Sequence, residues 1–126
     1  MENSVVIVDG VRTPMGGFQG DLNEVSMPEL GATVIKEAVN RAGVKPEEID
    51  EVIMGCILTA GAGQSPARQA MRKAGLPDST GAVTINKLCG SGMKAVMQAA
   101  DMIKAGSATY VVAGGMESMT NAPYVL

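Results

Sequence analysis

One cysteine of this chain, Cys89, lies where the sequence pattern changes from strand to helix. The β-branched, apolar run at 82–85 is typical of a buried strand, and the apolar spacing over 93–105 is typical of a helix. The first N–H groups of a helix have no internal partner and carry partial positive charge, which stabilises a thiolate. Residues 90–92, Gly-Ser-Gly, leave room for a substrate to approach the backbone. Cys89 is therefore a candidate nucleophile; the alternative is a small apolar residue buried at a helix start.

The other residues that could do chemistry exclude several kinds of site. Cys56 and Cys89 form no Cys-x-x-Cys pair, so the sequence predicts neither a disulfide framework nor a zinc or other metal site. A thiol redox protein is disfavoured for the same reason, since neither thiol has a resolving cysteine nearby. Histidine, the commonest general base and metal ligand, does not occur in the chain. Cys56 follows an apolar run and is expected to lie in the core.

Length and composition are those of one globular domain. The chain has 126 residues, of which 46% are hydrophobic and 18% charged. Its net charge of -3 disfavours a nucleic-acid surface, which would need a basic patch. No apolar run is long enough to span a membrane, and the first residues lack the basic region of a secretory signal. We therefore expect a cytoplasmic protein without nucleic-acid or membrane partners.

Short apolar runs alternate with helical patterns along the chain. Strands are predicted at 5–8, 52–54, 82–85 and 110–113, and helices at 27–42, 66–74 and 93–105. This β-α-β-α-β-α-β order predicts an α/β open sheet of parallel strands with helices on both faces.

Capping residues mark the ends of the predicted helices. Ser26 and Glu29 form a capping-box pattern at the start of the first helix, and Gly43 is expected to end it in a left-handed conformation. Ser65 is the expected N-cap of the second helix, ahead of Pro66. Small alanines at inward positions of the third helix predict that it is buried and closely packed on all sides.

The active site of such a sheet lies at the carboxyl ends of its strands. Three loops fall there, at 10–25, 86–92 and 114–121, and the second contains Cys89. Glu117 in the third loop is either an acid or base or, as we favour, a structural carboxylate that accepts backbone N–H bonds. A Gly-rich segment at 61–66 resembles a phosphate loop only loosely, because it lacks the GxxxxGK[ST] spacing and Pro66 has no N–H.

Four motifs in order resemble those of the thiolases. The stretch at 86–96, Asn-Lys-Leu-Cys-Gly-Ser-Gly-Met-Lys-Ala-Val, is similar to the segment that carries the acyl-enzyme cysteine of that family. The stretch at 114–124, which begins Gly-Gly-Met-Glu-Ser-Met-Thr, resembles the family's second N-terminal motif, and the segments at 12–16 and 61–69 match it too. The similarity runs along essentially the whole chain and is greatest to the acetyl-CoA C-acetyltransferase type.

The resemblance implies a reaction and a role for one residue. In thiolases the cysteine that matches Cys89 takes an acyl group from acyl-CoA as a thioester. A second acetyl-CoA, as a carbanion, then attacks that group in a reversible Claisen condensation, which gives acetoacetyl-CoA and CoA. Coenzyme A thioesters would be substrates, and no resident cofactor is expected. The Cys89 amide is expected to be one donor to the oxyanion that forms.

The chain departs from the family in how much of it is present. Residues 1–126 correspond to the N-terminal part of the thiolase N-terminal domain, without the loop domain and the C-terminal domain. The family's catalytic histidine and second catalytic cysteine belong to the missing part, so we expect this chain alone to be inactive. A homo-oligomer, formed at the sheet edge near 82–85 as in the family, or association with a C-terminal half is expected. The alternative function is that of a non-catalytic truncated or split-gene half-domain that acts only as an interaction partner.

Overall fold

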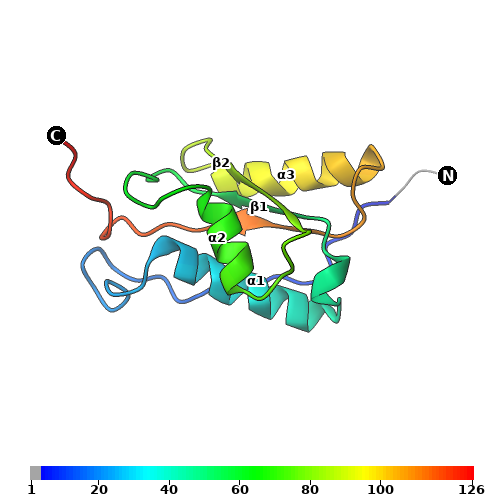
Figure 1. Ribbon diagram of the computed structural model, residues 1–126, viewed down its shortest axis with the longest axis horizontal. Helices are drawn as coiled ribbons and strands as arrows, with labels where there is room; N and C mark the ends of the chain where they lie inside the picture. Colours follow the sequence, from blue (N-terminus) through cyan, green and yellow to red (C-terminus); the bar gives the residue numbers. More distant parts are fainter. Residues whose placement is uncertain (1–3) are drawn as a thin grey trace.

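A computed structural model describes residues 4–126 and contains one three-stranded parallel sheet. The strands are β1 (Glu51–Gly55), β2 (Gly81–Ile85) and β3 (Val111–Gly115), in the order β2-β1-β3. Glu51 lies opposite both Gly81 and Val111, so all three strands end at the same level. Their carboxyl ends therefore form one edge, at the left of Figure 1.

Helices cover both faces of this sheet, as predicted. Helices α1 (Met27–Ala42) and α2 (Pro66–Lys73) pack together on one face, and α3 (Ser91–Lys104) lies on the other (Figure 1). A single turn of 3-10 helix, η1 (Pro46–Glu48), leads from α1 into β1. The predicted α/β class is confirmed.

Two separate apolar clusters hold these layers together. The larger cluster joins α1 and α2 to the sheet and includes Ile35, Val52 and Met71, each at most 1% exposed. The smaller one joins α3 to the other face through Ile53, Ala95 and Ala99. Burying a large aliphatic side chain contributes about 1.5–3 kcal/mol, so the first cluster supplies most of the apolar stabilisation.

Helix α1 begins and ends as its sequence predicts. The Ser26 amide donates to the Glu29 carboxylate (2.8 Å), and the Glu29 amide donates to the Ser26 hydroxyl (3.4 Å), which completes the capping box. The hydrogen bonds from the Ser26 side chain and backbone lower the pKa of Glu29. Gly43 ends the helix with a φ of 68°, a left-handed conformation that glycine adopts without steric cost.

The start of α2 corrects one prediction. Ser65 precedes Pro66 as expected, but it has a φ of 39° and its side chain makes no capping hydrogen bond. The Ala67 amide donates instead to the Thr84 hydroxyl on β2, at 3.0 Å. The cap is thus supplied by a residue distant in sequence, which no local pattern reveals.

The first predicted strand, at 5–8, does not form. Residues 5–8 have no strand conformation, and no backbone hydrogen bond joins them to another part of residues 4–126. A strand needs a partner about 4.8 Å away, whereas a cleft of about 570 Å³ separates this segment from β3. The β-branched run therefore lies exposed, with Ile7 at 81%.

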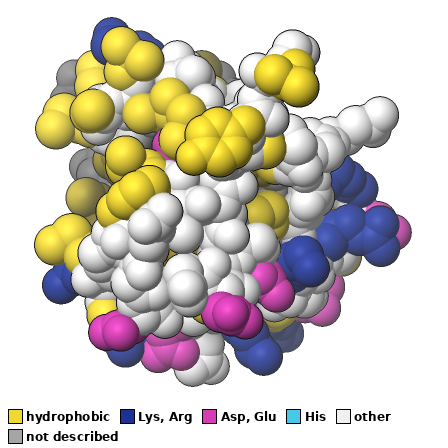
Figure 2. Space-filling view, turned by 90° about the vertical axis from the view of Figure 1, so that its left-hand side faces the viewer, with side chains coloured by type: hydrophobic (Ala, Val, Ile, Leu, Met, Phe, Trp, Pro, Cys, Tyr) yellow, Lys and Arg dark blue, Asp and Glu magenta, His cyan; other side chains and the backbone are white. Residues whose placement is uncertain are grey.

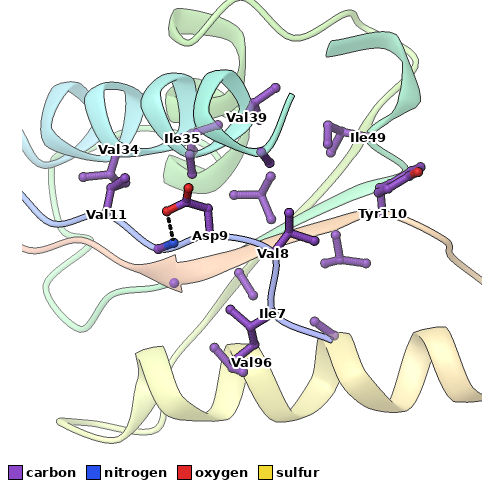
Figure 3. Close-up of a pocket in the computed structure, with 18 of the residues that line it drawn as sticks. Ile7, Val8, Asp9, Val11, Val34, Ile35, Val39, Ile49, Val96 and Tyr110 are labelled. Carbon is purple, nitrogen blue, oxygen red and sulfur yellow. Dashed lines mark hydrogen bonds between the residues drawn. The ribbon is translucent and has the colours of Figure 1, made fainter. Parts of the chain in front are cut away.

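Apolar side chains line this cleft. Figure 3 shows Ile7 and Val8 on the N-terminal segment, Val34 of α1 and Val96 of α3 among its lining residues. The outer edge of β3 faces the cleft without a strand partner among the residues the structure describes. An unpaired strand edge beside exposed apolar side chains favours association.

The prediction that α3 is buried on all sides is wrong. Only Ser91, Ala95 and Ala99 are buried, while Met93 is 75% exposed and Met97 is 53% exposed. The helix has one face on the sheet, and within residues 4–126 no element covers the opposite face. Small residues allow close packing but do not supply a second partner.

Besides the edge of β2, where the sequence predicts a homo-oligomer, the cleft beside β3 is a second surface through which we expect the chain to self-associate. In analytical ultracentrifugation at micromolar concentration, the chain should sediment as a species larger than a monomer. The double substitution Ile7→Asp and Val8→Asp should shift it toward the monomer, because charge in an apolar contact is costly to desolvate. Met15→Asp is the matched control, since Met15 is exposed but does not line the cleft. A single monomeric species for the unsubstituted chain would contradict this expectation.

Candidate active site

Cys89 occupies the predicted turn between β2 and α3. It follows the end of β2 at Ile85 by four residues and precedes Ser91, the first residue of α3, and its side chain is exposed. The residue before it, Leu88, has a φ of 52°, a left-handed conformation that is uncommon for a residue with a side chain. Strain of this kind persists only when the surroundings hold it in place.

Hydrogen bonds within the turn engage the amides on both sides of Cys89 but not its own. The amides on both sides of Cys89 each have an acceptor: Lys87 N–H to Ser91 Oγ (2.8 Å), Leu88 N–H to Asn86 Oδ1 (2.9 Å), Gly90 N–H to the Lys87 carbonyl (3.1 Å) and Ser91 N–H to the Leu88 carbonyl (3.1 Å). The Cys89 amide has no acceptor anywhere in residues 4–126. The exposed thiol therefore sits on a residue whose own N–H is available to a ligand.

Close contact between α3 and the strand ends fixes the turn in place. A Cβ atom added to Gly55 at the end of β1 would lie 2.4 Å from the Ser91 Cβ, so only glycine fits there. Gly92 and Gly115 also lie against each other, but less tightly: a Cβ added to Gly115 would lie 3.5 Å from the Gly92 Cα, an ordinary van der Waals contact. The start of α3 thus rests directly on the carboxyl ends of β1 and β3.

Glu117 acts as the structural carboxylate that the sequence favours. Its two carboxylate oxygens accept the amides of Ile57 (2.7 Å) and Leu58 (3.3 Å), in the loop that follows β1. Both oxygens are therefore engaged in holding one loop to another. Neither is positioned as a free base.

The loops at 10–25 and 114–121 are also brought together, as predicted. The Gln19 amide donates to the Thr120 hydroxyl (2.8 Å), and the Asn121 side chain donates to the carbonyls of Asn23 (3.0 Å) and Val25 (3.2 Å). Figure 2 looks at this end of the molecule and shows hydrophobic side chains gathered over its upper part.

Cys56 lies in the core, in contrast to Cys89. It is 2% exposed, and the Cys56 amide donates to the Ile85 carbonyl (3.0 Å). Burial and, after it, the negative charge of Glu117 raise the pKa of the Cys56 thiol. At neutral pH this thiol stays protonated, so it is a packing residue rather than a nucleophile.

The segment at 61–66 is a structural loop. The Gln69 side chain donates to the carbonyls of Ala62 (2.7 Å) and Gln64 (2.8 Å), which fixes the loop against α2.

Sequence inspection missed two residues with structural roles at this end of the sheet: Ser91, taken only as a small residue, and Asn121. A serine at the start of a helix is a recognised signal for local side-chain-to-backbone bonds, and Ser91 was detectable on that ground.

Comparison with known proteins decides the family. Residues 5–126 match the family model described as thiolase, N-terminal domain. The chain belongs to the thiolase family. The predicted resemblance is therefore confirmed, and it extends over nearly all of the chain.

Relatives named acetyl-CoA acetyltransferase come from distant organisms. Acetyl-CoA acetyltransferase of Cupriavidus necator is 63% identical over 97% of this chain, and that of Escherichia coli is 54% identical over 96%. The mitochondrial acetyl-CoA acetyltransferase of Danio rerio is 52% identical over 98% of the chain. The chain spans only 30–31% of the length of these three relatives.

A solved thiolase structure has the same fold. The crystal structure of the Acat5 thiolase from Ascaris suum in complex with coenzyme A superposes with a TM-score of 0.93 at 43% identity. The match covers 94% of this chain and 31% of the Ascaris chain. No helix within residues 4–126 of the present thiolase chain has the length and apolar character needed to cross a bilayer.

The two thiols should differ sharply in reactivity. At pH 7, iodoacetamide should modify Cys89 well before Cys56, because Cys89 is exposed and Cys56 is buried with a raised pKa. Peptide mapping by mass spectrometry after short reaction times measures both rates in one sample. Denaturing the chain should remove the difference. Equal rates, or faster reaction of Cys56, in the folded chain would contradict the structure of the turn.

Proposed function

We propose that this chain is the N-terminal part of an acetyl-CoA C-acetyltransferase and that Cys89 takes the acetyl group as a thioester. The observation that carries the proposal is the turn itself, which presents an exposed thiol beside its own unpaired N–H. Relatives at 52–63% identity are named acetyl-CoA acetyltransferase, which supports acetyl-CoA as the acyl donor.

The first half of the reaction uses groups that this chain supplies. The Cys89 thiol releases its proton to solvent. The thiolate then attacks the thioester carbonyl of acetyl-CoA, and a carbon–sulfur bond forms as negative charge moves to the carbonyl oxygen. The Cys89 N–H is the available donor to that oxyanion. The bond to the CoA sulfur then breaks, CoA leaves as a thiolate that takes a proton from solvent, and acetyl-Cys89 remains. A thiol suits this step because it is both a good nucleophile and a good leaving group.

The second half needs groups from elsewhere. Acetoacetyl-CoA forms when a second acetyl-CoA loses a proton from its methyl group and attacks acetyl-Cys89, and this step requires a base. The chain has no histidine, and the Glu117 carboxylate already accepts two backbone N–H groups. We infer that the base and most of the CoA site belong to the loop and C-terminal domains of a complete enzyme. The apolar cleft beside β3 supports association with such a part or with a second copy.

Acetyl transfer to Cys89 should be directly observable. After incubation with isotopically labelled acetyl-CoA, the label should be found on the peptide containing Cys89 and should be released by hydroxylamine, as a thioester is. Cys89→Ala should abolish the label, whereas Cys56→Ala, the matched control, should retain it. Label on Cys56, or no label on any residue, would contradict the proposal and favour the non-catalytic half-domain.

Turnover should nevertheless be absent from the isolated chain. With acetoacetyl-CoA and CoA as substrates, the chain should show no thiolysis above the uncatalysed rate, because no base is in place for the carbon–carbon step. The loss of acetoacetyl-CoA absorbance measures this, with Cys89→Ala as the baseline. Thiolysis by the isolated chain that disappears in Cys89→Ala would show that residues 1–126 already contain the missing base.

A further inference from the structure

Ser91 is a buried polar residue in an otherwise exposed turn. It is 4% exposed, whereas its neighbours Cys89 and Gly90 are exposed. Buried hydroxyl groups normally have hydrogen-bond partners, and both partners of Ser91 lie in the turn that carries Cys89.

The Ser91 hydroxyl ties together the two peptide groups that precede Cys89. Ser91 Oγ accepts the Lys87 amide at 2.8 Å and donates its own proton to the Leu88 carbonyl at 2.5 Å. The second contact holds Leu88 in its left-handed conformation, which would otherwise relax. Because its proton is already donated, Ser91 is not available as a nucleophile or proton relay.

The other side of Ser91 is fixed by the sheet. Its Cβ lies where a side chain on Gly55 would have to be, so no movement toward β1 is possible. The Ser91 Cβ is therefore fixed against β1, and its Oγ bonds to residues 87 and 88 of the turn. Without the hydroxyl, the Lys87 amide loses its acceptor, and the Leu88 carbonyl keeps only the Ser91 N–H, at 3.1 Å.

We propose that Ser91 is a positioning residue for Cys89. Its hydroxyl engages the groups around Cys89 so that the Cys89 N–H stays unpaired and fixed in direction while the thiol stays exposed. This role rests on the proposed acyl transfer, in which that N–H meets the developing oxyanion.

The test compares two reactions of the same thiol. Alkylation by iodoacetamide needs only an accessible thiol, whereas acylation by a small acetyl thioester, S-acetyl-N-acetylcysteamine, also develops an oxyanion. In Ser91→Ala, acylation of Cys89 should fall about tenfold or more, in line with loss of an oriented oxyanion donor, while alkylation should change less than about threefold. Ser107→Ala is the matched control, because Ser107 Oγ donates to the Met102 carbonyl at the far end of α3.

Four outcomes would overturn the proposal. If Ser91→Ala slowed both reactions of Cys89 equally, or allowed iodoacetamide to modify Cys56, Ser91 would contribute only to the stability of the fold. Unchanged acylation would mean that the hydroxyl does not position the turn. The same conclusion would follow if the unsubstituted chain had an acylation-to-alkylation ratio no higher than that of an unfolded cysteine peptide. Because the small thioester lacks the CoA moiety, acylation by it without acetyl transfer from acetyl-CoA would refute the proposed substrate and leave the role of Ser91 intact.

Discussion

Direct contact between the start of α3 and the carboxyl ends of β1 and β3 is the constraint on which the site depends. The contact with β1 exists because Gly55 has no side chain where Ser91 approaches it, while Gly92 and Gly115 lie against each other at ordinary contact distances. Any side chain at Gly55 would push Ser91 away and take the Cys89 turn with it. Glycine is destabilising inside a strand by roughly 0.5–1 kcal/mol relative to alanine. At Gly55 the geometry of the site is therefore favoured over the local stability of the end of β1.

The two cysteines show that environment rather than residue type decides reactivity. Cys56 and Cys89 both come shortly after a parallel strand, β1 and β2 respectively. Cys56 continues inward, where burial and the Glu117 carboxylate keep its thiol protonated. Cys89 lies on a turn that reverses outward to begin α3. The Glu117 carboxylate, which holds the loop after β1, adds to the effect of burial in raising the pKa of the Cys56 thiol.

Much of this structure follows from local sequence, and the exceptions share a cause. The ends of α1, the three strands that pair and the place of Cys89 were predictable, because capping residues, apolar runs and glycines act over a few positions. That residues 5–8 do not form the predicted strand could not be foreseen, since a strand needs a neighbour that the apolar run itself cannot specify. The Thr84 hydroxyl that caps α2 and the exposed side of α3 were unpredictable for the same reason, because both depend on residues distant in sequence. The role of Ser91 lay within reach of a local rule, but its burial against Gly55 is visible only in three dimensions.

Amide hydrogen exchange at the turn tests most directly the claim that these residues alone build the site. We expect the Lys87 amide, bound by Ser91 Oγ, and the Ser91 amide, bound by the Leu88 carbonyl, to exchange much more slowly than the Cys89 amide between them, which has no acceptor in residues 4–126. NMR spectroscopy of the isolated chain resolves the three positions. Exchange of all three at the rate of an unfolded peptide, or protection of Cys89 equal to that of Lys87, would contradict it.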